Sequence, residues 1–294
     1  MLVLVIAVLL GSRLPPQPKR SLDVGVDELR QVAEQLAGEA AEFVRRRRRE
    51  VFADGTPTAA VRAKSTPTDP VTVVDTETEE LVRRRLAELR PGDGVLGEEG
   101  GAGASGRAAP GGVTWVVDPI DGTVNFLYGI PAYAVSVAAQ IDGVSVAGAV
   151  ADVAAGQLYS AALGGGAHVS DTAGRRPLHC GDARELSMAL VGTGFGYQPA
   201  RRAAQAQLLA GLLPRVRDIR RIGSAALDLC HVAAGRLDGY YEHGLQRWDW
   251  AAGALIAVEA GARVWLPEAD TVPTVAAAPG IAEELWQLLV SLDG

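Results

Sequence analysis

The chain has 294 residues, of which 48% are hydrophobic and 21% are charged, and this balance is typical of a globular protein rather than a disordered one. Its formal net charge of −7 argues against duplex nucleic acid as the main partner. Only two cysteines occur, Cys180 and Cys230, and they form no CxxC motif. The sequence therefore predicts neither a disulfide framework nor a zinc knuckle, and it fits the reducing cytoplasm.

The first 20 residues differ in composition from the rest of the chain. "MLVLVIAVLL" is apolar but well short of the roughly 20 residues that span a bilayer, and no basic segment precedes it. "PPQPKR" then reads as an extended linker. We expect residues 1–20 to be a dispensable N-terminal extension without stable membrane insertion, followed by one domain over residues 21–294.

Helical periodicity opens this domain over residues 26–52 and returns over 75–90, where "DTETEELVRRRLAEL" starts acidic and ends basic. Between them, "VTVVD" predicts a short strand that ends on Asp75. The first helix finishes in five arginines, Arg45–Arg49. These favour a solvated helix end, with a polyanion-binding patch as the alternative.

A series of strands follows, and then strands alternate with helices. Short apolar runs separated by turn residues predict strands at 95–96, 113–117, 132–140, 144–152 and 156–161. The second half predicts strands near 188–194, 216–221, 237–242 and 262–266, and helices at 199–213, 224–235, 247–260 and 280–290. This order indicates an α/β fold with layered helices and mixed sheets, divided into an α+β half at about 21–185 and an α/β half at about 186–294.

The most informative stretch is "WVVDPIDGTVNF", in which two aspartates follow a buried strand at once. Pro119 fixes one φ angle between Asp118 and Asp121, and Gly122 permits a sharp turn after them. Carboxylates held this close repel each other unless protons or a cation compensate their charge. An exposed Asp-Pro turn is the simpler interpretation of these residues taken alone.

Other acidic residues also stand at the ends of predicted elements: Asp75, Glu98, Glu99 and Asp249. If these ends converge, the oxygen ligands select a hard cation such as magnesium or manganese. The four histidines show no metal-binding spacing. Several carboxylates around magnesium imply a substrate with its own negative charge, so phosphoester hydrolysis ranks first.

A phosphate cradle is expected beside such a site, and "RRIGSAALDLC" offers one. Gly223 and Ser224 stand where a strand ends and a helix begins, so free N–H groups there can meet an anion. A plain N-cap by Ser224 is the alternative.

Taken together, these motifs resemble the inositol monophosphatase family of magnesium-dependent, lithium-sensitive phosphatases. The resemblance covers residues 26 to 291 and is carried by "GEEG", "WVVDPIDGTVNF" and "GSAALDLCHVAAGRLDGYYEHGLQRWDWAAG"; the closest likeness is to actinobacterial members. It implies the αβαβα sandwich shared with fructose-1,6-bisphosphatases, a homodimer, and a small phosphate monoester as the substrate.

The resemblance also implies a ligand set for magnesium, with manganese as a possible substitute. Glu98, Asp118 and the carbonyl of Ile120 would hold the first ion. Asp118, Asp121 and Asp249 would hold the second, and a third, weaker ion would lie near Glu98. The cations would neutralise the phosphate charge, activate the attacking water and stabilise the leaving alkoxide.

The remaining implied roles concern water and substrate. Thr123, linked to Asp75, would orient and deprotonate the water with help from Glu98, and Lys64 matches the basic residue of the family's active-site loop. The backbone of Gly122 and Thr123 would meet the phosphate. Four further residues, together with Asp249, would line the substrate side: Gly223, Ser224, Ala225 and Glu242. The proposed phosphate cradle at Gly223 is thereby reinterpreted as a sugar-ring contact.

Two rival functions remain open at this stage. The same scaffold serves histidinol phosphatases, fructose-1,6-bisphosphatases and bisphosphonucleoside phosphatases, whose metal ligands do not distinguish them. Glu242 and the Gly223–Ala225 turn favour a polyol, so myo-inositol-1-phosphate is the expected substrate. The other rival is a regulatory protein that binds RNA or a polymerase through Arg45–Arg49.

Overall fold

The computed structural model describes residues 25–52, 61–63, 70–100, 109–267 and 272–293. The predicted N-terminal extension and Lys64 lie outside these residues.

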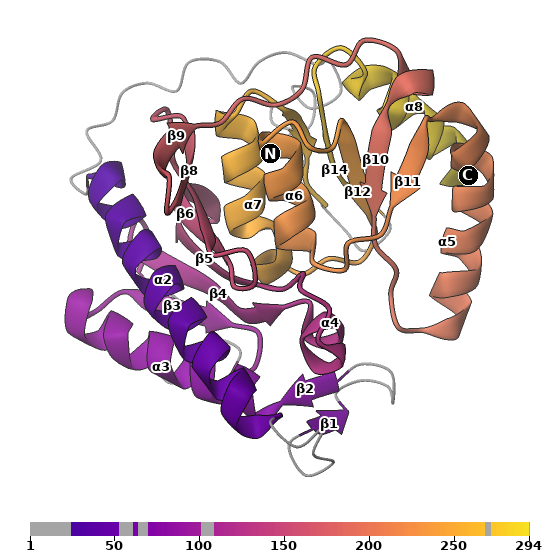
Figure 1. The fold of residues 1–294 in the computed structure, drawn as a ribbon. Helices are drawn as coiled ribbons and strands as arrows, with labels where there is room; N and C mark the ends of the chain where they lie inside the picture. The colour runs from indigo at the N-terminus through magenta and orange to yellow at the C-terminus, as the bar shows by residue number, and fades with distance from the viewer. Residues whose placement is uncertain (1–24, 53–60, 64–69, 101–108, 268–271, 294) are drawn as a thin grey trace.

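Five layers make up the molecule (Figure 1). Helices α2 (Val26–Val51) and α3 (Val73–Leu89) cover a seven-stranded sheet, whose other face packs on α6 (Ala225–Ala233) and α7 (Arg247–Glu259). A five-stranded sheet follows, with α5 (Pro199–Leu212) and α8 (Ala282–Asp293) on its far side. The expected αβαβα sandwich is confirmed.

Both sheets are mixed, as predicted. The larger contains β3 (Gly94–Gly97), β4 (Val113–Asp121), β5 (Ala134–Ile141), β6 (Val144–Asp152), β7 (Gln157–Ala162), β8 (Ala167–Asp171) and β9 (Gly174–Pro177), in that order. Only its β3–β4 pair is parallel. The smaller has the order β11 (Asp218–Arg220), β10 (Leu190–Thr193), β12 (Gly239–Glu242), β14 (Thr274–Ala277) and β13 (Arg263–Trp265). A small hairpin pairs β1 (Val61–Ala63) with β2 (Pro70–Thr72).

Strand residues alternate between cores on the two faces of the larger sheet. In β4, Trp115 and Val117 join the core under α2 and α3, whereas Val116 joins the core with α6 and α7. The inner helices can lie close to the strands because small residues line the contact. A Cβ on Gly148 would come within 3.0 Å of the Cα of Ala252 in α7. This close packing brings the N-termini of α6 and α7 toward the end of β4.

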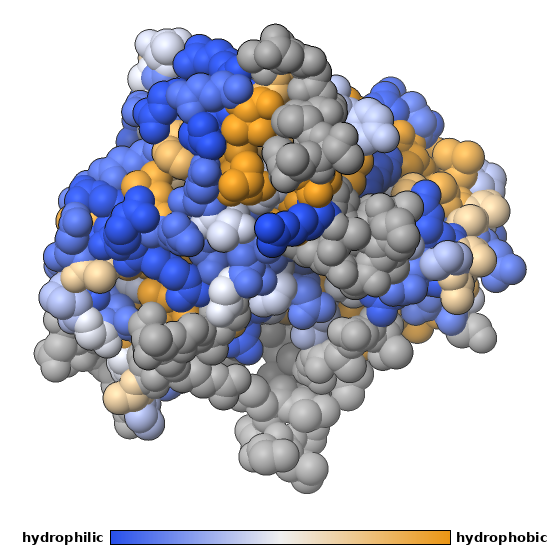
Figure 2. Space-filling model, turned by 90° about the horizontal axis from the view of Figure 1, so that it is seen from below, coloured by the Kyte–Doolittle hydropathy of each residue, from blue (hydrophilic) through white to orange (hydrophobic). Residues whose placement is uncertain are grey.

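Helix α2 is amphipathic, and its apolar stripe, which includes Leu29, Leu36 and Val44, is fully buried. Seen from below, the side on which α2 and α3 lie is largely hydrophilic, and hydrophobic side chains appear in separate patches elsewhere (Figure 2). No helix in the described ranges is both long enough and apolar enough to cross a membrane. Both cysteines are free thiols.

The arginine run at the end of α2 is engaged with the domain itself. Arg45 donates to the carbonyl of Val153 at 3.1 and 3.0 Å, and Arg47 forms an ion pair with Glu77. Arg48 donates to the carbonyl of Phe126 at 3.0 Å. The run is therefore a helix end bound to α3, to the short helix Thr123–Tyr128 and to the segment after β6, which counts against a free polyanion-binding patch.

Two predictions about local structure were wrong, and several short elements were missed. Asp75 does not end a strand, because Thr72 and Asp75 form a capping box that starts α3 at Val73. The strand expected at 113–117 continues through Asp121, so both aspartates of the motif lie within β4. The short helix α4 (Thr123–Tyr128) and strands β1, β8, β9 and β14 were not predicted, because each has only three to six residues and little periodicity.

Candidate active site

The end of β4 is irregular where the two aspartates stand. Asp118 pairs with Ser136 and Asp121 with Ala134 of β5, so the register shifts between them. The carboxylate of Asp118 accepts the N–H of Ile120 at 3.1 Å, a local hydrogen bond within this irregular part of the strand. Gly122 then adopts a φ of 95°, and a Cβ there would come within 3.0 Å of the carbonyl oxygens of Ala132 and Gly223.

Asp121 is held by the start of α6. Its Oδ2 accepts the hydroxyl of Ser224 at 2.5 Å and the N–H of Ala226 at 2.7 Å. Ser224 also caps α6 by accepting the N–H of Leu227 at 3.3 Å, so its interpretation as an N-cap is correct. Since Ser224 is only 2% exposed, its hydroxyl serves the protein rather than a solvent-facing ligand.

Asp249 and Glu98 approach the same place from two other elements. Asp249 lies in the first turn of α7, where its Oδ2 accepts the N–H of Gln246 at 2.6 Å. Glu98 follows β3, and its own N–H donates to the carbonyl of Val117 at 3.2 Å, beside Asp118.

The four carboxyl groups are near enough to act on one another's charge. Burial raises the pKa of Asp118 well above its ordinary value, and the negative charges of Glu98, Asp121 and Asp249 raise it further. Burial raises the pKa of Asp121 to about 6, although the hydrogen bond from Ser224 opposes this rise. The pKa of Asp249 is also raised well above normal, first by burial and then by the charges of Asp121 and Glu98. Charges gathered in this way require protons or cations to balance them.

The oxygen-only character of the cluster suits a hard divalent cation. In the described ranges, however, no three acidic, histidine or cysteine side chains stand close enough to form a ready-made metal site. The hydrogen bonds above already engage one oxygen of Asp118, Asp121 and Asp249, which fixes each group but turns part of it toward the backbone.

Thr123 connects this cluster to Asp75. Its hydroxyl oxygen lies 3.1 Å from Oδ1 of Asp75 and 3.0 Å from the carbonyl oxygen of Ile120. Asp75 also accepts the N–H and the hydroxyl of Thr72 at 3.0 and 2.5 Å. Full burial raises the pKa of Asp75 to about 7, and the charges of Glu99 and Glu98 contribute to the rise.

The expected substrate side lies at the end of β12. Tyr240 donates its hydroxyl to Oε2 of Glu242 at 2.7 Å, and burial raises the pKa of Glu242 to about 7. A Cβ on Gly194 would come within 1.8 Å of this oxygen, so glycine leaves room for the carboxylate. Gly223 has a φ of 98° and precedes Ser224 and Ala225 at the start of α6.

Sequence reasoning missed three buried polar residues around the cluster. The amide of Asn125 ties α4 to two loops by donating to the carbonyls of Ala132 and Ile222 at 2.7 and 2.9 Å. Asp228 in α6 is 1% exposed, and Glu79 in α3 is 3% exposed. Glu79 stands four residues after Asp75, on the same helix face, and this spacing was the available signal.

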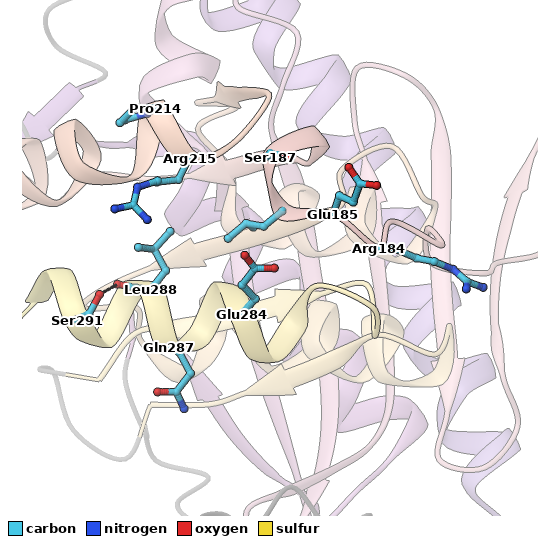
Figure 3. Close-up of a pocket in the computed structure, with 10 residues that line it drawn as sticks. Arg184, Glu185, Ser187, Pro214, Arg215, Glu284, Gln287, Leu288 and Ser291 are labelled. Atoms are coloured by element: carbon cyan, nitrogen blue, oxygen red, sulfur yellow. Dashed lines mark hydrogen bonds between the residues drawn. The ribbon is translucent and has the colours of Figure 1, made fainter.

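A hollow of about 690 Å³ lies elsewhere, on the outer side of the five-stranded sheet (Figure 3). It is lined mainly by α8 and by the segments 184–187 and 214–215, and it contains none of the predicted site residues.

Comparisons with known proteins agree with this architecture. A profile of the inositol monophosphatase family matches residues 26–291. The inositol-1-monophosphatase SuhB of Mycobacterium tuberculosis is 66% identical over 274 residues, which cover 90% of this chain and 94% of that protein. A solved structure of Mycobacterium tuberculosis SuhB superposes with a TM-score of 0.78 at 60% identity, covering 91% of this chain and 98% of that one. A structure described as inositol monophosphate bound SaIMPase-II superposes with a TM-score of 0.68 at 28% identity, covering 88% and 92% of the two chains. The chain therefore belongs to the inositol monophosphatase family of phosphoric monoester hydrolases.

Proposed function

We propose that this protein is a Mg²⁺-dependent phosphomonoesterase that hydrolyses myo-inositol-1-phosphate to inositol and phosphate. The observation that carries the proposal is the convergence of three separate stretches of the chain on one place, where the buried carboxyl groups of Asp118, Asp121 and Asp249 meet the turn that bears Glu98. The family relative with bound inositol monophosphate supports a polyol phosphate as the substrate class.

The donor set fits magnesium, since every candidate ligand is a carboxylate or a backbone carbonyl. Glu98, Asp118 and the carbonyl of Ile120 would hold one ion. Asp118, Asp121 and Asp249 would hold a second, and a third would bind more weakly near Glu98. Bound magnesium would supply charge neutralisation for the phosphate and a lowered pKa for the attacking water.

Thr123 and Asp75 supply the proton path. A water on the solvent side of Thr123 can donate a proton to its Oγ1 while the threonine hydroxyl passes its own proton to Oδ1 of Asp75. With its pKa near 7, Asp75 exchanges a proton readily at neutral pH. Positioning and general-base help of this kind contribute about 10²–10⁴-fold to the rate.

The substrate itself is recognised by backbone and carboxylate groups in this proposal. The N–H groups of Gly122 and Thr123 would meet the phosphate. The carboxylate of Glu242 would accept hydrogen bonds from hydroxyl groups of the inositol ring, and Gly223 and Ala225 would lie beside the ring. Ser224 would contribute mainly through Asp121, because its side chain is buried against that carboxylate.

A panel of phosphate-release assays tests the substrate and the metal together. We expect the highest kcat/KM on myo-inositol-1-phosphate compared with histidinol phosphate, fructose-1,6-bisphosphate and adenosine bisphosphate, with activity lost in chelator and restored by Mg²⁺ or Mn²⁺. Lithium is expected to inhibit. A preference for either bisphosphate would contradict the polyol assignment.

The family likeness also supports a homodimer, which light scattering would check, and a cytoplasmic location. A regulatory role through Arg45–Arg49 is less well supported, since three of these arginines bind groups of the domain itself. Expression of a catalytically inactive Asp249→Asn chain separates the two functions. We expect it to fail to rescue a deletion strain, and full rescue would favour the regulatory role.

A further inference from the structure

The turn that carries Glu98 is fixed by three consecutive backbone amides. The N–H of Glu98 donates to Val117 in β4 at 3.2 Å. The N–H groups of Glu99 and Gly100 donate to the two carboxylate oxygens of Glu79, at 2.8 and 2.9 Å. The turn is thus held on one side by the strand that bears Asp118 and on the other by helix α3.

Glu79 is built into this position. Its side chain is 4% exposed and forms an ion pair with Arg83, one helical turn further on, at 2.8 Å. A buried carboxylate is stable when its oxygens are occupied by donors, and two amides and a guanidinium supply them here. The Glu79 carboxylate is therefore held in one position, and the turn at residues 97–100 packs against it.

The two glycines of "GEEG", Gly97 and Gly100, leave the space that the Glu79 carboxylate occupies. A Cβ on Gly97 would lie 2.3 Å from the carboxyl carbon of Glu79, and a Cβ on Gly100 would lie 2.7 Å from Oε1. Any side chain at Gly97 would therefore displace the Glu79 carboxylate. The turn therefore packs closely against the Glu79 carboxylate both before Glu98, at Gly97, and after it, at Gly100.

We propose that Glu79 is a positioning residue for the metal ligand Glu98. One helix then serves two parts of the reaction, because α3 carries Asp75 for the proton path and, one turn later, Glu79 for the ligand turn. The inference rests on the proposed function, in which Glu98 binds magnesium. Glu79 would act through the turn alone, because both of its carboxylate oxygens are already bonded to backbone amides.

The test compares Glu79→Gln with the control Glu80→Gln, which alters the adjacent, exposed glutamate. Two measurements are made on chelator-treated protein: amide hydrogen exchange at residues 98–100, and calorimetric titration with Mn²⁺. We expect Glu79→Gln to speed exchange at Glu99 and Gly100 and to weaken Mn²⁺ binding about 10–100-fold, as loss of a group that orients a ligand typically does. Glu80→Gln should match the wild type in both.

Activity provides a third readout. Because the variant loses metal affinity rather than a reacting group, its kcat on myo-inositol-1-phosphate should recover at high Mg²⁺. If Glu79→Gln fails to fold, Glu79→Asp replaces it, since aspartate keeps the charge for Arg83 but is one methylene too short to reach both amides. That variant should show the same faster exchange and weaker binding.

The outcomes separate this inference from the proposed function. Unchanged Mn²⁺ affinity in the variant, with or without faster amide exchange, would overturn the role of Glu79 while leaving the metal site in place. A wild-type protein that binds no Mn²⁺ would overturn the proposed function and this inference with it.

Discussion

Replacing Ser224 by alanine tests the contact between α6 and Asp121 most directly. The substitution removes the 2.5 Å hydrogen bond to Oδ2 of Asp121 and the N-cap of α6. An N-cap contributes about 1 kcal/mol, and a hydrogen bond to an ionised group contributes about 1.5–3 kcal/mol. We therefore expect the free energy of unfolding to fall by about 2.5–4 kcal/mol at pH 7.5 in chelator, which for a chain of this length lowers the melting temperature by about 4–7 °C.

The pH dependence of this loss identifies its origin. Asp121 has a pKa of about 6, so it is ionised at pH 7.5 and mostly protonated at pH 5 in the metal-free protein. The hydrogen bond from Ser224 favours the ionised form, so the destabilisation should shrink as the pH falls through 6. Ser224→Gly is the matched control, because glycine costs an N-cap only a few tenths of a kcal/mol. Thermal melts that show the same loss of about 1 kcal/mol at both pH values for Ser224→Ala would refute the contact with Asp121.

Three further changes test other parts of the structure. Asp118→Asn or Asp121→Asn should abolish Mg²⁺-dependent phosphate release while the far-UV circular dichroism stays native, and near-wild-type rates would contradict the two-ion assignment. In Tyr240→Phe, loss of the donor to Glu242 should raise the pKa of that carboxyl above about 7. As the pH is lowered, the KM for inositol phosphate should therefore start to rise at a higher pH in the variant than in the wild type. A KM profile that does not shift with the substitution would disprove this role of Tyr240. Arg48→Met should lower the free energy of unfolding by about 1–2 kcal/mol in denaturant melts, because it removes the hydrogen bond to the Phe126 carbonyl and a cation–π contact. The control Arg49→Met alters an exposed arginine of the same helix end and should stay within about 0.5 kcal/mol of the wild type.

Much of this architecture could be predicted because long elements are encoded locally. The helix from Val26 follows from its amphipathic periodicity, and the helix from Arg247 follows from a capping box and the run of small and aliphatic residues after it. Asp75 shows where local patterns compete. Its β-branched neighbours predicted a strand, but the capping box with Thr72 is satisfied only when a helix starts at Val73.

The supports of the candidate site could not be predicted in the same way. Ser224 and Asp121 are 103 positions apart in the chain, and Glu79 reaches amides 20 and 21 positions away. Such contacts depend on how the layers of helices and sheets pack together, and this packing cannot be derived from the local patterns of a single sequence. The sequence motifs identified the acidic residues, but the hydrogen-bond donors that position their carboxylates could be identified only from the folded structure.

Those donors share a physical origin that explains how the domain tolerates so many buried acids. Asp75 and Asp249 each occupy the third position of a helix and accept the N–H of its cap residue, while Asp121 accepts an N–H from the first turn of α6. Three helices, α3, α6 and α7, therefore direct their N-termini, with their partial positive charge, at the same group of carboxylates. Because this charge belongs to the backbone, it is present before any cation binds. Divalent ions would then complete the compensation and draw the carboxylates into a closed ligand set, which these side chains do not form by themselves in the described ranges.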